Sequence, residues 1–258
     1  MTRKNIQSNS IVLHEPFLLK PAYKDYLWGG RRLNDEFSKN IDSEIVAETW
    51  ECSTHPDGVS DISSGFFKGK KLNEVISKHP SMLGKKWKHL KELPIIVKLI
   101  DAKKDLSIQV HPDDYYARTH ENGQNGKIEL WYILDAKKDS KIIYGFHHTL
   151  SKDSFIKKVD GSKIESLLQK VPVKSDDVFL IEPGLVHAIG EGVLLAEIQE
   201  SSNITYRIFD YNRADKNGNK RELHISKAID VINLNSSKEP VQPMRVLNYA
   251  PGCASEVL

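Results

Sequence analysis

Apolar and polar residues alternate in many short stretches of this 258-residue chain, and turn-forming residues separate the stretches. A period of two is typical of a β-strand, in which successive side chains point to opposite faces. The pattern therefore predicts a mainly β protein with accessory α-helices, whose strands between Pro94 and Asp210 close into a single barrel. The predicted strands are Glu44–Glu51, Pro94–Asp101, Leu106–His111, Lys127–Leu134, Lys141–Phe146, Val178–Ile181, Val193–Gln199 and Ile204–Phe209.

Three segments space their apolar residues three or four apart, as the buried face of a helix does. Lys70–Lys78 predicts a short helix that ends before Pro80, and Arg221–Asn233 predicts a helix that leads out of the barrel. Ser151–Gln169 is interrupted at Gly161, so it predicts two short helices inserted between barrel strands. We expect all of these helices to lie outside the barrel.

The stretch Leu106–Leu134 carries polar residues that fit a metal site. Gln109 and His111 are two apart in one predicted strand, so their side chains share a face, and Glu129 lies on the next strand. A later tight turn, Glu-Pro-Gly, delivers His187. Imidazole and carboxylate groups on rigid strands suit a divalent first-row metal ion, and zinc is the first choice.

Taken one at a time, these residues have ordinary explanations. His111 precedes a proline and fits a turn histidine, and Glu129 fits the solvated face of a strand, since most residues of either type bind no metal. The combination of the side chains is what favours a metal site.

Charge and cysteine content exclude several classes of protein. The chain has 37 basic and 35 acidic residues, so it lacks the global positive field that nucleic-acid binding usually needs. Its two cysteines lie far apart, which indicates neither a disulfide framework nor a cysteine metal site and favours a reducing cytosol. The first ten residues are polar and no apolar run reaches the length of a membrane span. We expect a cytoplasmic protein with a small-molecule substrate and no membrane or nucleic-acid partner.

Six longer motifs stand out along the chain: YLWGGRRL, AETWECSTHPDG, QVHPDD, GKIELWY, EPGLVHAIG and TYRIFDYNR. Together they resemble the short bacterial form of type I phosphomannose isomerase, the zinc-dependent mannose-6-phosphate isomerase of the cupin superfamily. They occur in the family's order, and the resemblance extends from about Pro16 to about Asn233. It implies a cupin fold, a jelly-roll-like β-barrel.

The resemblance also implies an activity and its central residues. The family interconverts D-mannose 6-phosphate and D-fructose 6-phosphate by zinc-assisted proton transfer through a cis-enediolate. Gln109, His111, Glu129 and His187 would hold one zinc ion, with the amide oxygen of Gln109 as the weakest donor. Arg207 matches the catalytic arginine of the family, and its permanent charge suits the enediolate or the phosphate.

Further candidates surround this set. Lys127 shares a strand face with the predicted carboxylate ligand and is the next catalytic candidate, for phosphate binding or proton transfer, although a solvated lysine explains it equally well. The resemblance makes Trp50, Ser53 and His55 candidates for lining the substrate site. The general base stays open among Glu191, His55, Lys127 and a zinc-bound water.

On this resemblance, residues 1–233 form the catalytic cupin domain, with the helical insertion at about 151–170. Residues 234–258 lie where a second cupin half begins in the family, and we expect that half to be truncated. Two other functions stay open: an iron-dependent cupin dioxygenase and a non-catalytic sugar-phosphate-binding cupin. Metal content and oxygen consumption would separate the dioxygenase from the isomerase.

Overall fold

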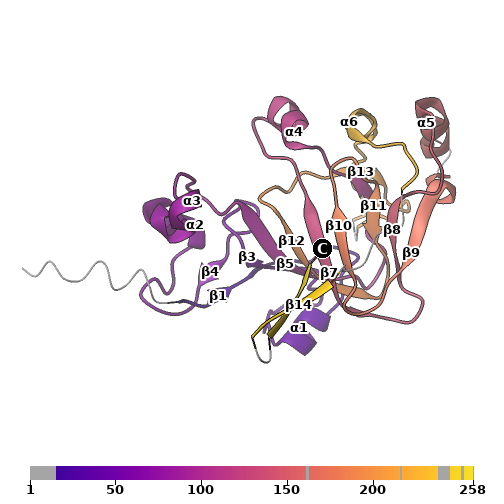
Figure 1. Ribbon diagram of the computed structural model, residues 1–258. Coiled ribbons are helices and arrows are strands. Elements are labelled where there is room, and N and C mark those ends of the chain that lie inside the picture. Colours follow the sequence, from indigo (N-terminus) through magenta and orange to yellow (C-terminus); the bar gives the residue numbers. More distant parts are fainter. Residues whose placement is uncertain (1–15, 161–162, 216, 238–244, 251–252, 258) are drawn as a thin grey trace, which may run out of the picture.

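Two antiparallel sheets form the body of the protein in this computed structural model, which describes residues 16–160, 163–215, 217–237, 245–250 and 253–257 (Figure 1). The six-stranded sheet has the order β10-β7-β12-β5-β3-β2, and the five-stranded sheet has the order β13-β6-β11-β8-β9. In sheet order, the first contains β10 (Val178–Ile181), β7 (Glu129–Ala136), β12 (Val193–Glu200), β5 (Ile95–Asp101), β3 (Glu48–Cys52) and β2 (Ala22–Lys24). The second contains β13 (Tyr206–Phe209), β6 (Ile108–Val110), β11 (His187–Ile189), β8 (Lys141–Phe146) and β9 (Leu168–Pro172).

The prediction of a mainly β, antiparallel protein is therefore confirmed, but the prediction that the strands close into a single barrel is wrong. Closure would require hydrogen bonds between the edge strands of the two sheets. Within the described residues β9 pairs with β8 and β10 pairs with β7, and no ladder joins one sheet to the other. The sheets instead meet through side chains, as in a jelly roll.

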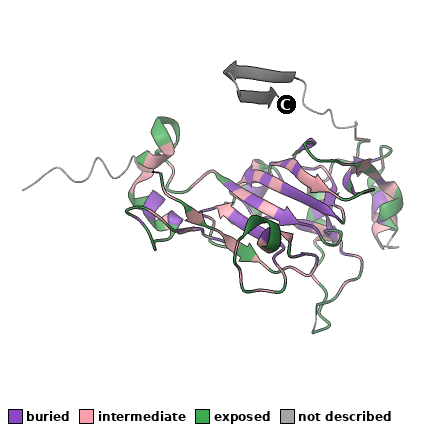
Figure 2. Cartoon of the chain, turned by 90° about the horizontal axis from the view of Figure 1, so that it is seen from below, coloured by how far each residue is buried: buried purple, intermediate pink, exposed green. Residues whose placement is uncertain are grey.

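The core between the sheets explains why strands from both are apolar on their inner faces. Ile100, Trp131 and Leu195 of the six-stranded sheet form one cluster with Ile142 and Ile189 of the five-stranded sheet. Alternation along each strand sends every second side chain into this cluster. Figure 2 shows the buried residues gathered on these strands and the exposed ones on helices and loops.

Helices cover the other face of the five-stranded sheet. Ile108, Val110 and Ala188 on that face form a second cluster with Phe155 of α5 (Lys152–Asp160) and Ala228 of α6 (Ile225–Val231). Helix α4 (Asp114–His120) and the 3₁₀ helix η3 (Ile164–Leu167) add to it, and Figure 1 shows α4, α5 and α6 on one side of the body. The five-stranded sheet is thus covered by apolar side chains on its helix side as well as in the core between the sheets.

The remaining elements form a smaller lobe and two peripheral pieces. The lobe packs Ile62, Phe67 and Val75 into a cluster of its own. The lobe contains β1 (Leu19–Lys20), β4 (Asp61–Ile62), α2 (Leu72–Lys78), η2 (Pro80–Leu83) and α3 (Gly84–Trp87). The peripheral pieces are α1 (Arg32–Phe37) and the paired strands β14 (Arg245–Ala250) and β15 (Cys253–Val257). Within the described ranges, no helix combines the length and the apolar character needed to span a membrane.

Candidate metal centre and substrate cavity

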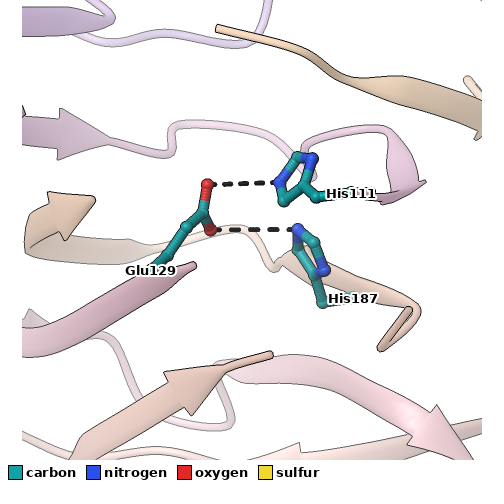
Figure 3. A group of neighbouring side chains, drawn as sticks. All are labelled: His111, Glu129 and His187. Carbon is teal, nitrogen blue, oxygen red and sulfur yellow. Dashed lines mark ion pairs between the residues drawn. The ribbon is translucent and has the colours of Figure 1, made fainter. Parts of the chain in front are cut away.

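Two histidines and one glutamate meet between the two sheets (Figure 3). His111 follows β6 and His187 begins β11, both in the five-stranded sheet, whereas Glu129 begins β7 in the six-stranded sheet. The Nε2 atom of His111 lies 3.2 Å from Glu129 Oε1, and Nε2 of His187 lies 3.9 Å from Glu129 Oε2. Candidate ligand atoms of all three residues lie within 4.8 Å of one another, and all three side chains are buried. The cluster therefore forms only because the two sheets pack face to face.

A glycine turn ties the two histidines to each other. Gly184, between β10 and β11, has φ +83°, a conformation that favours glycine. Its N–H donates to the His111 carbonyl oxygen at 2.9 Å. A Cβ at this position would lie 2.9 Å from the carbonyl oxygen of Val231, at the end of α6. The Glu-Pro-Gly turn thus fixes where β11, and with it His187, starts relative to the end of β6.

A second glycine brings Glu129 to the histidines. A Cβ on Gly126 would lie 2.4 Å from the backbone nitrogen of Asp114, so the loop can pass the start of α4 only without a side chain. The Lys127 N–H then donates to the carbonyl oxygen of Pro112 at 3.1 Å. This contact sets the start of β7 beside the residue that follows His111.

The cluster fits a metal ion because it leaves buried polar atoms without partners. Among the described residues, neither His111 Nε2 nor His187 Nε2 has a hydrogen-bond partner of acceptable geometry, although both atoms are buried. His187 Nδ1 lies 2.9 Å from the carbonyl oxygen of Leu185, so Nδ1 carries the proton and Nε2 offers its lone pair to the cluster. Buried atoms of this kind are costly unless a partner binds them. Gln109 pairs with His187 in the β6–β11 ladder and lines the adjoining cavity.

Electrostatics favour the protonation states that a metal needs. Burial and the charge of Lys127 lower the pKa of His111 to about 3, and burial lowers the pKa of His187. Burial alone would raise the pKa of the Glu129 carboxyl, but the charge of Lys127 holds it well below its usual range. The site thus combines two neutral imidazoles with a carboxylate, the forms in which these groups bind divalent ions.

A polar cavity of about 270 Å³ adjoins the cluster. Four of the predicted site residues line it: Gln109, Lys127, Glu129 and Arg207. Many of the other residues that line the cavity are polar as well. A polar lining suits a hydroxylated, charged ligand better than an apolar one. The polar residues that sequence reasoning missed are Tyr26, Glu48, Lys98, Ser107, Glu197, Asn203, Thr205 and Arg221.

Two buried lysines face carboxylates in this cavity. Lys127 Nζ lies 2.8 Å from Glu129 Oε1, and Lys127 is only 4% exposed, so the alternative of a solvated lysine is wrong. Lys98 Nζ lies 3.0 Å from Glu197 Oε1 and 4.0 Å from Glu48 Oε2. Burial opposes the charge of Lys98, but these carboxylates outweigh it and raise the pKa of the ammonium group. The cavity therefore contains cations and carboxylates in direct contact.

Arginines line another part of the cavity wall. Arg207 Nη1 donates to the carbonyl oxygen of Glu222 at 2.9 Å, and Arg207 Nε donates to Ser107 Oγ at 3.3 Å. Arg221 Nε donates to Asp210 Oδ2 at 2.8 Å. Burial and the neighbouring Arg221 lower the pKa of Arg207, as expected for two guanidinium groups near each other. This wall is suited to an anion.

Four predicted residues belong neither to the metal cluster nor to the cavity lining. Trp50 and Ser53 are fully buried, and the ring of His55 lies 6.0 Å from that of Trp50. Glu191 is exposed in the turn between β11 and β12, where the carbonyl oxygen of Glu191 accepts a hydrogen bond from Ser140. The structure therefore brings together the predicted metal, lysine and arginine residues, and places these four outside them.

Facing antiparallel sheets with two histidines and a glutamate between them, a cluster that could hold a metal ion, are typical of a protein of the cupin class. Comparison with known proteins narrows this class. Residues 17–136 match the family model of the phosphomannose isomerase type I catalytic domain. Together with relatives that are more than 40% identical over more than two thirds of their own length, this match shows that the chain belongs to the type I phosphomannose isomerase family.

Relatives extend the similarity beyond the matched domain. The chain is 42% identical over 225 residues to mannose-6-phosphate isomerase ManA of Bacillus subtilis, covering 87% of this chain and 70% of the relative. It is 41% identical over 220 residues to the mannose-6-phosphate isomerase of Streptococcus mutans, covering 85% and 68%. The crystal structure of the mannose 6-phosphate isomerase from Bacillus subtilis superimposes with a TM-score of 0.84 at 38% identity, covering 91% of this chain and 74% of that one.

Proposed function

We propose that this protein is a zinc-dependent isomerase that interconverts D-mannose 6-phosphate and D-fructose 6-phosphate in the cytoplasm. One observation supports this proposal most directly: the cluster of His111, Glu129 and His187 adjoins a polar cavity that is lined in part by arginines. The chain that carries this site belongs to the phosphomannose isomerase family. The cavity has room for one sugar phosphate and groups of both charges to bind it.

His111, Glu129 and His187 hold the zinc ion in this proposal, and Gln109 is the fourth and weakest donor. Zinc held by these residues would supply a positive charge, the chemistry that favours a developing oxyanion on the sugar. The neutral imidazoles and the ionised carboxylate described above are ready for this role without loss of a proton.

The side chains around the cluster divide the remaining tasks. Isomerisation moves one proton between C1 and C2 through a cis-enediolate, so it needs a group that takes and returns the proton and an anchor for the phosphate. Arg207 and Arg221 form the anion-binding subsite, which holds the phosphate or the enediolate. Lys127 is held beside the cluster by Glu129 and donates hydrogen bonds to the sugar oxygens.

Glu197 is a better candidate for proton transfer than the exposed Glu191. It lines the cavity, and burial together with the charge of Glu129 raises the pKa of its carboxyl above the usual value. A raised carboxyl pKa is the direction that favours general acid–base catalysis. Two carboxyl groups whose pKa values are pushed apart commonly have different roles in one site. Here Glu129 is the ligand and Glu197 is the group that moves the proton.

A coupled assay tests the proposal. Mannose 6-phosphate is supplied to the metal-free chain with added zinc, and fructose 6-phosphate is measured through phosphoglucose isomerase and glucose-6-phosphate dehydrogenase. We expect turnover that chelator removes and zinc restores. Absence of turnover in a chain that carries one zinc ion would overturn the isomerase assignment. Oxygen consumption with iron(II) would support a dioxygenase instead.

A further inference from the structure

The indole of Trp131 contacts two carboxylates in the metal centre. Trp131 lies on the inner face of β7, two residues after Glu129, and is fully buried. Its Nε1 atom donates to Glu129 Oε2 at 3.0 Å and to Glu197 Oε2 at 3.1 Å. Glu197 is directly opposite Trp131 in the β7–β12 ladder, so strand register places both acceptors at one N–H. A single neutral donor therefore bridges a candidate metal ligand and the carboxylate next to it.

This hydrogen bond restricts the orientation of Glu129. With Oε2 held by the indole, Oε1 faces His111 Nε2 at 3.2 Å and Lys127 Nζ at 2.8 Å. The Trp131 ring also meets the ring of His187 edge to face, with centroids 5.6 Å apart at 76°. Trp131 thus touches two members of the cluster through one rigid side chain.

We propose that Trp131 is a positioning residue for the metal centre, which acts through Glu129 and His187 rather than on the substrate. Phenylalanine could fill much of the same space, but it has no donor for the two carboxylates. Loss of the N–H leaves buried Glu129 Oε2 without this partner and lets the carboxylate rotate. Outer partners of metal ligands commonly change metal affinity by about 10- to 100-fold when removed.

The chain offers a matched control at Trp50. This residue is also fully buried on the six-stranded sheet, and its Nε1 donates at 2.8 Å to Glu48 Oε2, again the glutamate two residues earlier. Glu48 is outside the cluster of His111, Glu129 and His187. Trp50→Phe therefore removes the same kind of hydrogen bond from the same sheet without touching a candidate ligand.

The test measures metal binding directly and rests on the zinc site of the proposed function. Metal-free parent, Trp131→Phe and Trp50→Phe are titrated with zinc against a chromophoric chelator, and their cobalt(II) forms are compared by visible absorption. We expect zinc binding about 10- to 100-fold weaker in Trp131→Phe, with an altered cobalt spectrum, and less than about threefold change in Trp50→Phe.

The outcomes separate the two proposals. Failure of the parent to bind zinc would overturn the metal site itself, and the role of Trp131 with it. A parent that binds zinc while Trp131→Phe binds it equally well, with the same cobalt spectrum, would overturn the positioning role alone. If Trp131→Phe does not fold, replacement of Trp131 by β-(3-benzothienyl)alanine, which substitutes sulphur for the N–H at nearly constant shape, decides by the same two readouts.

Discussion

Replacement of Gly184 by alanine should damage both the stability of the fold and the metal centre. At φ +83° an alanine is held in a left-handed conformation, which costs about 1–2 kcal/mol. Its Cβ would also lie 2.9 Å from the carbonyl oxygen of Val231, a backbone atom at the end of α6 that cannot rotate away. Forced overpacking of this kind costs a further ~1–3 kcal/mol. We therefore expect Gly184→Ala to lose about 2–5 kcal/mol of unfolding free energy.

Gly123→Ala separates the two contributions. Gly123 has nearly the same φ, +81°, but a Cβ there meets no atom within 4 Å, so only the backbone strain applies. Urea unfolding of the metal-free proteins, followed by circular dichroism, should show a smaller loss for Gly123→Ala, about 1–2 kcal/mol. Zinc titration should show weaker binding only in Gly184→Ala, because the Gly184 N–H holds the His111 carbonyl oxygen. Equal losses of stability in the two variants, or unchanged zinc affinity in Gly184→Ala, would refute this account of the turn.

Three further predictions concern single side chains. His111→Ala should lose zinc and turnover together, measured by elemental analysis and the coupled assay, because three strong ligands become two; retained zinc would contradict this. Arg207→Ala should keep its zinc and thermal midpoint while turnover falls roughly a hundredfold, and Arg207→Lys should recover only part of it; full activity of Arg207→Ala would exclude the role. Asp210 is the subject of the third: burial alone would raise the pKa of its carboxyl, but hydrogen bonds from Arg221 and Arg213 hold it below its usual value. Because the folded pKa is depressed, this stabilisation is fully present above pH ~4 and is lost as pH falls through the lowered pKa. The thermal midpoint of Asp210→Asn should therefore depend less on pH between about 5 and 2 than that of the parent, and parallel curves would argue against it.

Local alternation predicted several strands and the faces of their side chains. Strands β8 and β10 have the predicted bounds, Lys141–Phe146 and Val178–Ile181. On β7, Glu129 and Trp131 were expected on one face, and both are buried on the inner face of the sheet, while Leu130 between them is only half-buried. A period of two is a property of the strand itself, so it can be read without knowing the neighbours.

Helix α4 shows a local signal that sequence reasoning missed. The sequence pattern predicts no helix directly after His111, yet Asp113 is an N-cap whose carboxylate accepts from the Tyr116 N–H at 2.8 Å. An aspartate three residues before the amide it binds is a known helix start. The apolar contribution of α4 to the core is limited to Ala117 among its fully buried residues, so helical periodicity was too weak to reveal it.

Strand register is the information that the sequence lacked, and it determines the chemistry of the cavity. Pro94–Asp101 is predicted as a strand, and its inner face carries Ile96 and Ile100, but Lys98 lies between them on the same face. A buried lysine is costly unless a carboxylate faces it. The β5–β12 ladder places Glu197 directly opposite Lys98, and Trp131 lies on the other side of Glu197. A shift of either strand by one residue would turn these side chains to the opposite face and leave Lys98 without its partner. The ion pair thus both depends on the register and opposes its slippage, and the same register that stabilises the sheet supplies the cavity with its charged groups.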